Sequence, residues 1–386
     1  MWRPLNWFGP SGKTMTTILF RVEAGPETGL GHLRRSASLA TALQQEGIQS
    51  RFLVSGDPKC LDLLEPFGLS AEPLLEVPPW TQEDLQVTQE TVRRCQAQAL
   101  LVDAKQVSAS YLTGFKQGRV SLIVRDDLAG FPIPAQMVIN GNANAAELPY
   151  RSLNGETHFL LGPEYLVLSK EFWRPSQRVV KPKVGEILVI LGGTDPHHLM
   201  PRLLKLLDEI PGSFSVTAVV GPFFEGRAEV AAAADGSRRC VTVVDSPLSV
   251  RDLMQEADLA VSAAGQTLYE LACVGCPTVA IQVDPDQEGQ LRAWAGLGCV
   301  RVAGEAKEPD LLIKVKEAVT SLMEDGAARS TLAKAGQRWV DGQGGIRVAR
   351  AISSKFLSRK IPRNGVSSKF LSRKIPRSGV SSMVQR

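Results

Sequence analysis

Residues 18–47 most restrict how this chain can fold, because an apolar run, a glycine loop and an amphipathic helix follow one another directly. Residues 18–22 read as a strand, and Gly29 and Gly31 then flank Leu30. Apolar residues recur afterwards at three- and four-residue spacing, at Leu33, Ala37, Ala40 and Leu43. Glycines let backbone N–H groups approach a ligand, and a helix N-terminus favours anions. With His32 at the helix start, the unit predicts a phosphate site beside a potential base; the alternative is an ordinary turn with a histidine cap.

Strand-like runs alternate with helical stretches along most of the chain. The first half has such runs at 18–22, 50–54, 99–102, 121–124 and 137–139, and the second at 187–191, 215–220, 240–244, 259–262, 278–281 and 300–302. Strands separated by helices pair in parallel and build doubly wound sheets. We therefore predict an α/β chain with Rossmann-like domains at 15–165 and 185–352, joined by a proline-containing connection at 166–184. The carboxyl ends of the two sheets are expected to face a cleft.

Charge is distributed unevenly over the 386 residues. The formal net charge is +4, but residues 351–386 hold nine Lys or Arg and no acid, and residues 15–350 hold 33 basic against 40 acidic residues. The body therefore gives no reason to expect nucleic-acid binding. Six scattered cysteines indicate a reducing, cytoplasmic setting, and Cys273 and Cys276 are expected in a packed core. No apolar stretch reaches the roughly 20 residues of a membrane span.

The C-terminal tail contains a tandem repeat. Residues 353–366 recur at 367–380 with one change, Asn364 against Ser378. The tail offers too little apolar surface to offset the entropy of ordering it, so residues 353–386 are predicted to be disordered. The alternative is weak contact with an anionic surface.

Residues 262–290 form the most informative stretch of the second half. A strand ends at Ser262, Gly265 turns the chain, and Thr267 opens a helix with Glu270 one turn inside. This arrangement presents free N–H groups to a diphosphate and a carboxylate to both hydroxyls of a ribose. A solvated helical acid is the alternative for Glu270. The polar groups after the next strand are suited to fixing a sugar: Asp284, Asp286, Gln287 and Gln290.

Other strand ends carry further candidates. Gly192 and Gly193 permit close backbone approach in the loop 191–198, where Thr194 or Asp195 can cap the next helix. The adjacent His197 and His198 are interpreted as surface residues. Three aspartates also follow strands, and each either lines the cleft or caps a turn: Asp103, Asp126 and Asp127.

These residues together carry a family resemblance. The opening FRVEAGPETGLGHLRRSASLA resembles the GxGHxxRxLxLA start of the UDP-sugar hydrolases of pseudaminic acid biosynthesis and of their relatives among spore-coat polysaccharide proteins. The resemblance continues at residues 102–103, 126–128, 160–165, 191–196, 256–281 and 341–348. It implies a GT-B fold related to the glycosyltransferase that makes lipid II. It also implies UDP on the second domain, His32 acting from the first, and Glu270 holding the ribose.

The resulting hypothesis is a hydrolase that releases UDP from a deoxy, acetamido-type UDP-sugar. Water would attack the anomeric carbon with His32 as general base, and UDP would leave toward helix N-termini without a metal or cofactor. The expected substrate residues are Gly29, Gly31, Arg35, Asp103, Asp127, Asp286 and Gln287. The expected UDP residues are Gly192, Gly193, Thr194, Gly265, Gln266, Thr267 and Glu270.

Two other function classes stay open from the sequence. A GT-B glycosyltransferase would use the same UDP site and base with an acceptor hydroxyl in place of water. A non-catalytic nucleotide-sugar-binding protein is the other, because Glu23, Ala264, Lys105 and Asp286 depart from the family pattern. A monomer is expected in every case.

Overall fold

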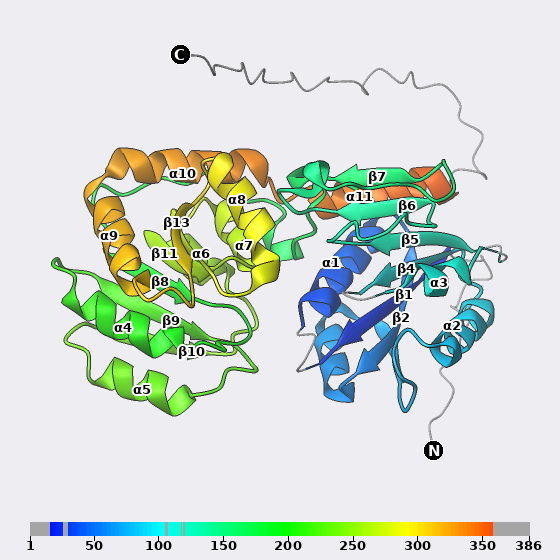
Figure 1. The fold of residues 1–386 in the computed structure, drawn as a ribbon, viewed down its shortest axis with the longest axis horizontal. Coiled ribbons are helices and arrows are strands. Elements are labelled where there is room, and N and C mark those ends of the chain that lie inside the picture. Colours follow the sequence, from blue (N-terminus) through cyan, green and yellow to red (C-terminus); the bar gives the residue numbers. More distant parts are fainter. Residues whose placement is uncertain (1–15, 26–29, 105–106, 117, 119, 358–386) are drawn as a thin grey trace, which may run out of the picture.

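The computed structural model describes residues 16–25, 30–104, 107–116, 118 and 120–357 (Figure 1). The first half forms a seven-stranded sheet in the order β3-β2-β1-β4-β5-β6-β7, and every pair in it is parallel. Its strands are β1 (Thr17–Ala24), β2 (Gln49–Gly56), β3 (Ser70–Leu74), β4 (Ala99–Asp103), β5 (Ser121–Arg125), β6 (Met137–Asn140) and β7 (His158–Leu161).

The second half forms a six-stranded parallel sheet in the order β10-β9-β8-β11-β12-β13. Its strands are β8 (Glu186–Ile190), β9 (Ser215–Val220), β10 (Val241–Asp245), β11 (Leu259–Ala263), β12 (Thr278–Gln282) and β13 (Arg301–Glu305). In both sheets the order reverses beside the first strand, at β1–β4 and at β8–β11. These reversals are the switch points at which doubly wound sheets bind ligands.

Helices connect the strands and cover the sheets. The first domain contains α1 (Gly31–Gln45), α2 (Gln82–Arg94) and α3 (Ala109–Thr113). The second half of the chain contains α4 (Leu199–Glu209), α5 (Arg227–Asp235), α6 (Arg251–Glu256), α7 (Thr267–Val274), α8 (Glu288–Gly296), α9 (Leu311–Glu324), α10 (Gly326–Trp339) and α11 (Gly344–Ile352). The two predicted Rossmann-like domains are therefore present.

Every strand expected from the sequence is found, and two strands were missed. Strands β3 and β7 each pair with a single neighbour, so they are the edges of the first sheet. Pro73 lies within β3, and only one residue of each strand is fully buried. Edge strands need no continuous apolar run, and they tolerate proline. Their sequences consequently lack the signal that identified the central strands.

The connection between the domains is packed against both of them. Leu166 and Leu168 belong to the second domain's apolar cluster, whereas Val167 belongs to the first domain's cluster. Successive side chains of an extended segment point to opposite sides. Three consecutive residues therefore join two hydrophobic cores.

Helix α11 returns to the first domain. Val348, Ala349 and Ile352 are buried in the same apolar cluster as Ile18 and Leu43, and Figure 1 shows α11 in the lobe that contains α1. The sequence placed residues 344–352 with the second domain. That prediction is wrong for α11, because the chain crosses back after α10 and its last helix packs on the first core.

The predicted disordered tail also starts too early. Residues Ser353–Leu357 continue α11 as a π-helical turn, and Phe356 packs against the first apolar cluster. The remainder of the tail, residues 358–386, lies outside the described residues. In the described part of the chain, no helix is long and apolar enough to cross a membrane.

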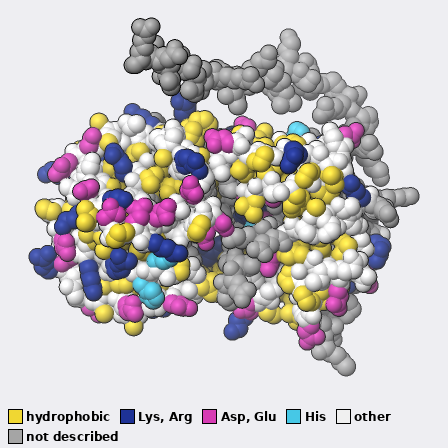
Figure 2. All heavy atoms as spheres, viewed as in Figure 1, with side chains coloured by type: hydrophobic (Ala, Val, Ile, Leu, Met, Phe, Trp, Pro, Cys, Tyr) yellow, Lys and Arg dark blue, Asp and Glu magenta, His cyan; other side chains and the backbone are white. Residues whose placement is uncertain are grey.

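The visible surface mixes both signs of charge. Figure 2 shows Lys and Arg side chains interspersed with Asp and Glu over the lobe that contains α4 and α9.

Cys273 and Cys276 are fully buried in the second domain's cluster, as the sequence predicted.

Candidate functional site

The candidate residues of the first domain gather at its switch point. Asp103 is the last residue of β4 and pairs with Val22 of β1. Helix α1 begins just after β1, and His32, Arg35 and Ser36 lie one helical turn apart on one of its faces. The topology therefore brings a short strand end and the first turns of a helix together from distant parts of the sequence.

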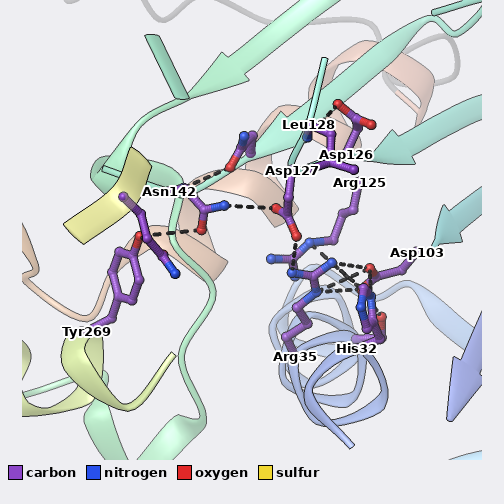
Figure 3. A network of polar contacts seen from close by, with 12 residues as sticks. His32, Arg35, Asp103, Arg125, Asp126, Asp127, Leu128, Asn142 and Tyr269 are labelled. Atoms are coloured by element: carbon purple, nitrogen blue, oxygen red, sulfur yellow. Dashed lines mark hydrogen bonds and ion pairs between the residues drawn. The ribbon is translucent and has the colours of Figure 1, made fainter. Parts of the chain in front are cut away.

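One buried carboxylate organises this cluster. His32 Nδ1 lies 2.8 Å from Asp103 Oδ1, and Ser36 Oγ donates to Asp103 Oδ2 at 2.8 Å. Arg35 Nε donates to Asp103 Oδ2 at 2.9 Å, and its Nη2 donates to Oδ1. Figure 3 shows the side chains of His32 and Arg35 converging on Asp103. Asp103 is wholly excluded from solvent, so the cluster supplies the hydrogen bonds that a buried charge requires.

The electrostatics keep Asp103 ionised. Burial acts to raise the pKa of Asp103, but the nearby Arg35, His32 and Arg125 outweigh it and hold that pKa well below its usual range. Burial likewise acts to lower the pKa of Arg35, and its contacts with Asp103 and Asp127 raise it above the usual value. The result is a charged, hydrogen-bonded pair beside the imidazole.

The carboxylate selects the tautomer of His32. Arg35 Nη2 also lies 3.0 Å from His32 Nδ1. A guanidinium can only donate, so Nδ1 would have to be unprotonated to accept from Arg35, and protonated to donate to Asp103. Placing the Nδ1 proton on the hydrogen bond to Asp103 satisfies the short contact. It leaves Nε2 as the nitrogen that can accept a proton, on a side chain that is 14% exposed.

The two aspartates after β5 have different partners. Asp127 accepts a hydrogen bond from Arg35 Nη1 at 2.8 Å, and so joins the cluster. Asp126 accepts from the backbone N–H groups of Leu128 and Ala129, and therefore caps a turn. The pKa of Asp127 is lowered, because Arg35 and Arg125 overcome the effect of burial.

On the second domain, the loop between β11 and α7 leaves backbone N–H groups undonated at the start of a helix. Within the described residues, the backbone N–H groups of Gly265, Gln266 and Thr267 donate no hydrogen bond, as expected at a helix start. Gln287 lies beside this loop: a Cβ placed on Gly265 would be 3.9 Å from its Nε2. Gln287 Oε1 accepts from the Val283 N–H at 2.9 Å, which leaves its amide nitrogen on the side of Gly265.

Glu270 is a half-buried carboxylate one turn inside α7, and no hydrogen bond or ion pair to it is found in the described part of the chain. Burial raises its pKa from an ordinary 4.5 to about 7. Arg34 opposes that rise, although it belongs to α1 of the other domain. Glu270 therefore lies within electrostatic reach of the helix that carries His32.

The remaining predicted positions are more dispersed. Gly192, Gly193 and Thr194 follow β8, beside β11, so they share the second switch point with Gly265. Asp195, not Thr194, caps α4, since its carboxylate accepts from the N–H groups of Leu199 and Met200. Three further residues complete the set: Asp286 is exposed in the segment Pro285–Gln287, Gly31 is the first residue of α1, and Gly29 lies outside the described residues.

The adjacent histidines lie in different surroundings: His198 is exposed, as predicted, whereas His197 is half-buried. His197 Nε2 lies 3.0 Å from the Val283 carbonyl oxygen, and His198 is exposed near Glu229. Among the described residues, no cluster of three His, Cys, Asp or Glu side chains is arranged around a metal position.

Sequence reasoning missed several residues of the site. Ser36 follows His32 by one turn, so its spacing carried a signal. Arg125 directly precedes the two aspartates, is 3% exposed, and approaches Asp103 at 3.8 Å, and burial and Arg35 lower its pKa to about 10. Asn142 and Tyr269 had no local signal for the contact between the domains, because the two residues are far apart in the sequence.

Comparison with known sequences finds a relative that matches most of the chain. No family model matches this chain. The spore coat polysaccharide biosynthesis protein SpsG of Bacillus subtilis (strain 168) is 25% identical over 341 residues, covering 86% of this chain and 97% of that protein. The alignment agrees with the spore-coat part of the sequence resemblance, and the pseudaminic acid part stays a prediction.

Solved structures resemble the chain over almost its whole length. Acinetobacter baumannii MurG aligns with a TM-score of 0.65 at 16% identity, covering 88% of this chain and 99% of that one. The calicheamicin glycosyltransferase CalG4 gives 0.60 at 15%, covering 91% and 100%. The UDP co-structure of S. aureus MnaA gives 0.61 at 13%, also covering 91% and 100%. This chain has the GT-B fold.

Proposed function

We propose that this protein is an enzyme that cleaves a UDP-sugar between the anomeric carbon and the β-phosphate oxygen, with water as the acceptor. The observation that carries the proposal is the His32–Asp103 pair at one switch point, combined with a glycine loop and Glu270 at the other. The name of the SpsG relative supports a role in surface polysaccharide synthesis. A deoxy, acetamido-type sugar is the substrate that the family resemblance favours.

The proposed chemistry follows from the arrangement of the donors. The free N–H groups at the start of α7 bind the diphosphate, and Glu270 accepts the ribose hydroxyls. His32 Nε2 takes a proton from water as the water oxygen bonds to the anomeric carbon. The bond from that carbon to the phosphate oxygen breaks, and UDP leaves with the electron pair. Asp103 stabilises the imidazolium that forms.

A glycosyltransferase is the second candidate, and the fold shared with CalG4 favours it. In that reaction His32 would take its proton from an acceptor hydroxyl instead of water. The same residues would hold UDP. The two candidates therefore differ in one measurable property, namely whether UDP is released when no acceptor is present.

The test is UDP release from a panel of UDP-sugars by the purified full-length protein, without and with polysaccharide or sugar acceptors. Release without an acceptor supports the hydrolase. Release that requires an acceptor supports the transferase, and UDP binding without any turnover supports a binding protein.

Substituting the proposed base gives the matched variant. His32→Ala should lower turnover by roughly a hundredfold or more while UDP affinity is kept, the usual scale for loss of a general base. His158→Ala removes a histidine that is exposed on the edge strand β7, and should leave turnover unchanged. Near-normal turnover by His32→Ala would remove His32 from the mechanism.

A further inference from the structure

A set of hydrogen bonds crosses between the two domains at Tyr269, one residue before Glu270 (Figure 3). The Tyr269 hydroxyl accepts from the backbone N–H of Ala143 at 3.1 Å, in the loop after β6 of the first domain. Its single proton has two acceptors within reach. These are Gln290 Oε1 at 3.0 Å and Asn142 Oδ1 at 3.4 Å.

On the first domain, these contacts continue to the His32 cluster. Asn142 Nδ2 donates to Asp127 Oδ1 at 3.2 Å, and Asp127 Oδ2 accepts from Arg35 Nη1 at 2.8 Å. Arg35 in turn holds the carboxylate of Asp103, which contacts His32. Asp127, Arg35 and Asp103 in this series therefore each contact a member on either side.

On the second domain, the contacts reach the glycine loop. Gln290 Nε2 donates to the carbonyl oxygen of Ala264 at 2.8 Å, and Ala264 directly precedes Gly265. Helix α8 also closely approaches the loop of the first domain, because a Cβ on Gly289 would lie 2.8 Å from Asn144 Nδ2. The glycine loop and the His32 cluster are therefore the two ends of one connected series of polar groups.

Tyr269 is held rigidly at the centre of this series. Its side chain is 1% exposed, and its ring meets that of Trp294 edge-on, with centroids 4.8 Å apart at 72°. Burial raises the pKa of the Tyr269 hydroxyl, so it stays protonated and keeps its proton for donation. Buried polar groups with satisfied hydrogen bonds rigidify the structure around them.

We propose that Tyr269 is a positioning residue that couples the nucleotide loop at 264–267 to the orientation of His32. The proposal rests on the proposed function, since it assigns the loop to the nucleotide and His32 to the chemistry. Tyr269 contacts neither the nucleotide nor the reacting atoms in this scheme. Its hydroxyl donates to Gln290 and accepts from the Ala143 N–H, and so holds the loop whose Asn142 side chain contacts Asp127, the partner of Arg35.

The variant Tyr269→Phe tests the proposal, because it removes the hydroxyl and keeps the ring packing. We expect kcat to fall about tenfold while the Kd for UDP stays within about twofold of the original value, the pattern for a lost transition-state arrangement. Tyr111→Phe is the matched control. The Tyr111 hydroxyl is also buried and donates to Asp84 at 2.9 Å, outside this series. The Tyr111→Phe variant should therefore melt at a lower temperature, with kcat unchanged.

A double-mutant cycle tests whether the groups act as one series. Asn142→Ala removes the next link, and the double variant Tyr269→Phe/Asn142→Ala should lose no more kcat than the worse single variant. An unchanged kcat in Tyr269→Phe would overturn the proposal. So would losses that multiply in the double variant, or a fall in UDP affinity that matches the fall in kcat.

Amide hydrogen exchange on the UDP-free full-length chain separates this proposal from the reaction itself. Tyr269→Phe should speed exchange in residues 140–145 and in the first turn of α1, and Tyr111→Phe should not. A change confined to residues 264–270 would overturn the coupling. If the exchange pattern holds but no UDP-sugar is turned over, the proposed reaction fails and the coupling stands.

Discussion

At the scale of single residues, Glu270 combines a structural cost with a proposed binding role. Burial raises its pKa from 4.5 to about 7, so the folded chain binds this proton more tightly than the unfolded chain. Between these two values, stability falls as the pH rises, because the native state must give up a proton that it holds more strongly. Above about pH 7 the whole cost is present, and below 4.5 it is absent.

The variant Glu270→Gln should therefore be more thermally stable than the original protein at pH 8, with the difference shrinking toward pH 5. The same variant should bind UDP more weakly at pH 8, because an amide cannot accept both ribose hydroxyls as a carboxylate does. Melting curves and calorimetric UDP titrations measure the two effects. Glu288→Gln, an exposed acid of α8, is the control that should show neither. Equal stability at pH 8 would contradict the pKa assignment, and equal UDP affinity the ribose role.

At the scale of elements, α11 depends on close backbone contacts. Gly344 begins the helix against the connection between the domains, and a Cβ at this position would lie 2.0 Å from the Leu166 carbonyl oxygen. Backbone atoms cannot move aside as the end of a flexible side chain can. A side chain at this position would consequently force the start of α11 or the connection between the domains to shift.

Gly344→Ala should lower the free energy of unfolding by roughly 1–3 kcal/mol, the usual cost of overpacking. Gly345→Ala is the matched control on the same helix. Its Cβ would meet Val167 Cγ1 at 3.5 Å, an ordinary contact, and alanine favours a helix over glycine. Chemical denaturation of both variants measures their free energies of unfolding. Equal values would show that α11 can shift to make room for a side chain at position 344.

At the scale of the whole molecule, the C-terminal helix of the described chain packs on the N-terminal domain. The first core contains residues from both ends of the described chain, from Ile18 to Ile352, and Phe356 extends that packing. The two domains are therefore joined twice, once by the connection at 166–168 and once by the return of α11. These two connections hold together the two domains that contribute to the polar series at Tyr269.

Two truncations test where the folded chain ends. Removing residues 358–386 should leave the melting temperature and UDP-sugar turnover nearly unchanged, because that segment has no acid and few apolar residues. Removing residues 353–386 should lower the melting temperature by about 2–4 °C, since burying part of Phe356 contributes roughly 1 kcal/mol. Equal melting temperatures for the two truncations would show that Phe356 packing contributes nothing.

The shorter truncation also tests contact with anionic surfaces. Each Lys or Arg close to an anionic membrane contributes roughly 1 kcal/mol, so the full chain should bind anionic vesicles weakly at low salt. The chain that ends at residue 357 should not bind them. Binding that survives the truncation would place the surface contact on the folded body.

The sequence by itself determined the local features of this protein. Apolar runs alternating with helical periodicity predicted both parallel sheets, and glycines after β1, β8 and β11 marked the loops where polar groups gather. These predictions succeeded because strand and helix periods and turn chemistry act within a few residues of one another. The edge strands β3 and β7 were missed because an edge carries a weaker apolar pattern.

Only the tertiary structure decided which distant groups meet. His32 contacts Asp103 across 71 positions, and Ala143 contacts Tyr269 across 126. Two adjacent aspartates with the same local context took different partners, since the Asp127 carboxylate meets Arg35 and the Asp126 carboxylate accepts from N–H groups of its own turn. Such pairings depend on how helices and sheets pack in three dimensions, and no local pattern encodes them. The return of α11 to the first core was decided in the same way, because its apolar face fits either domain by pattern and only one domain by packing.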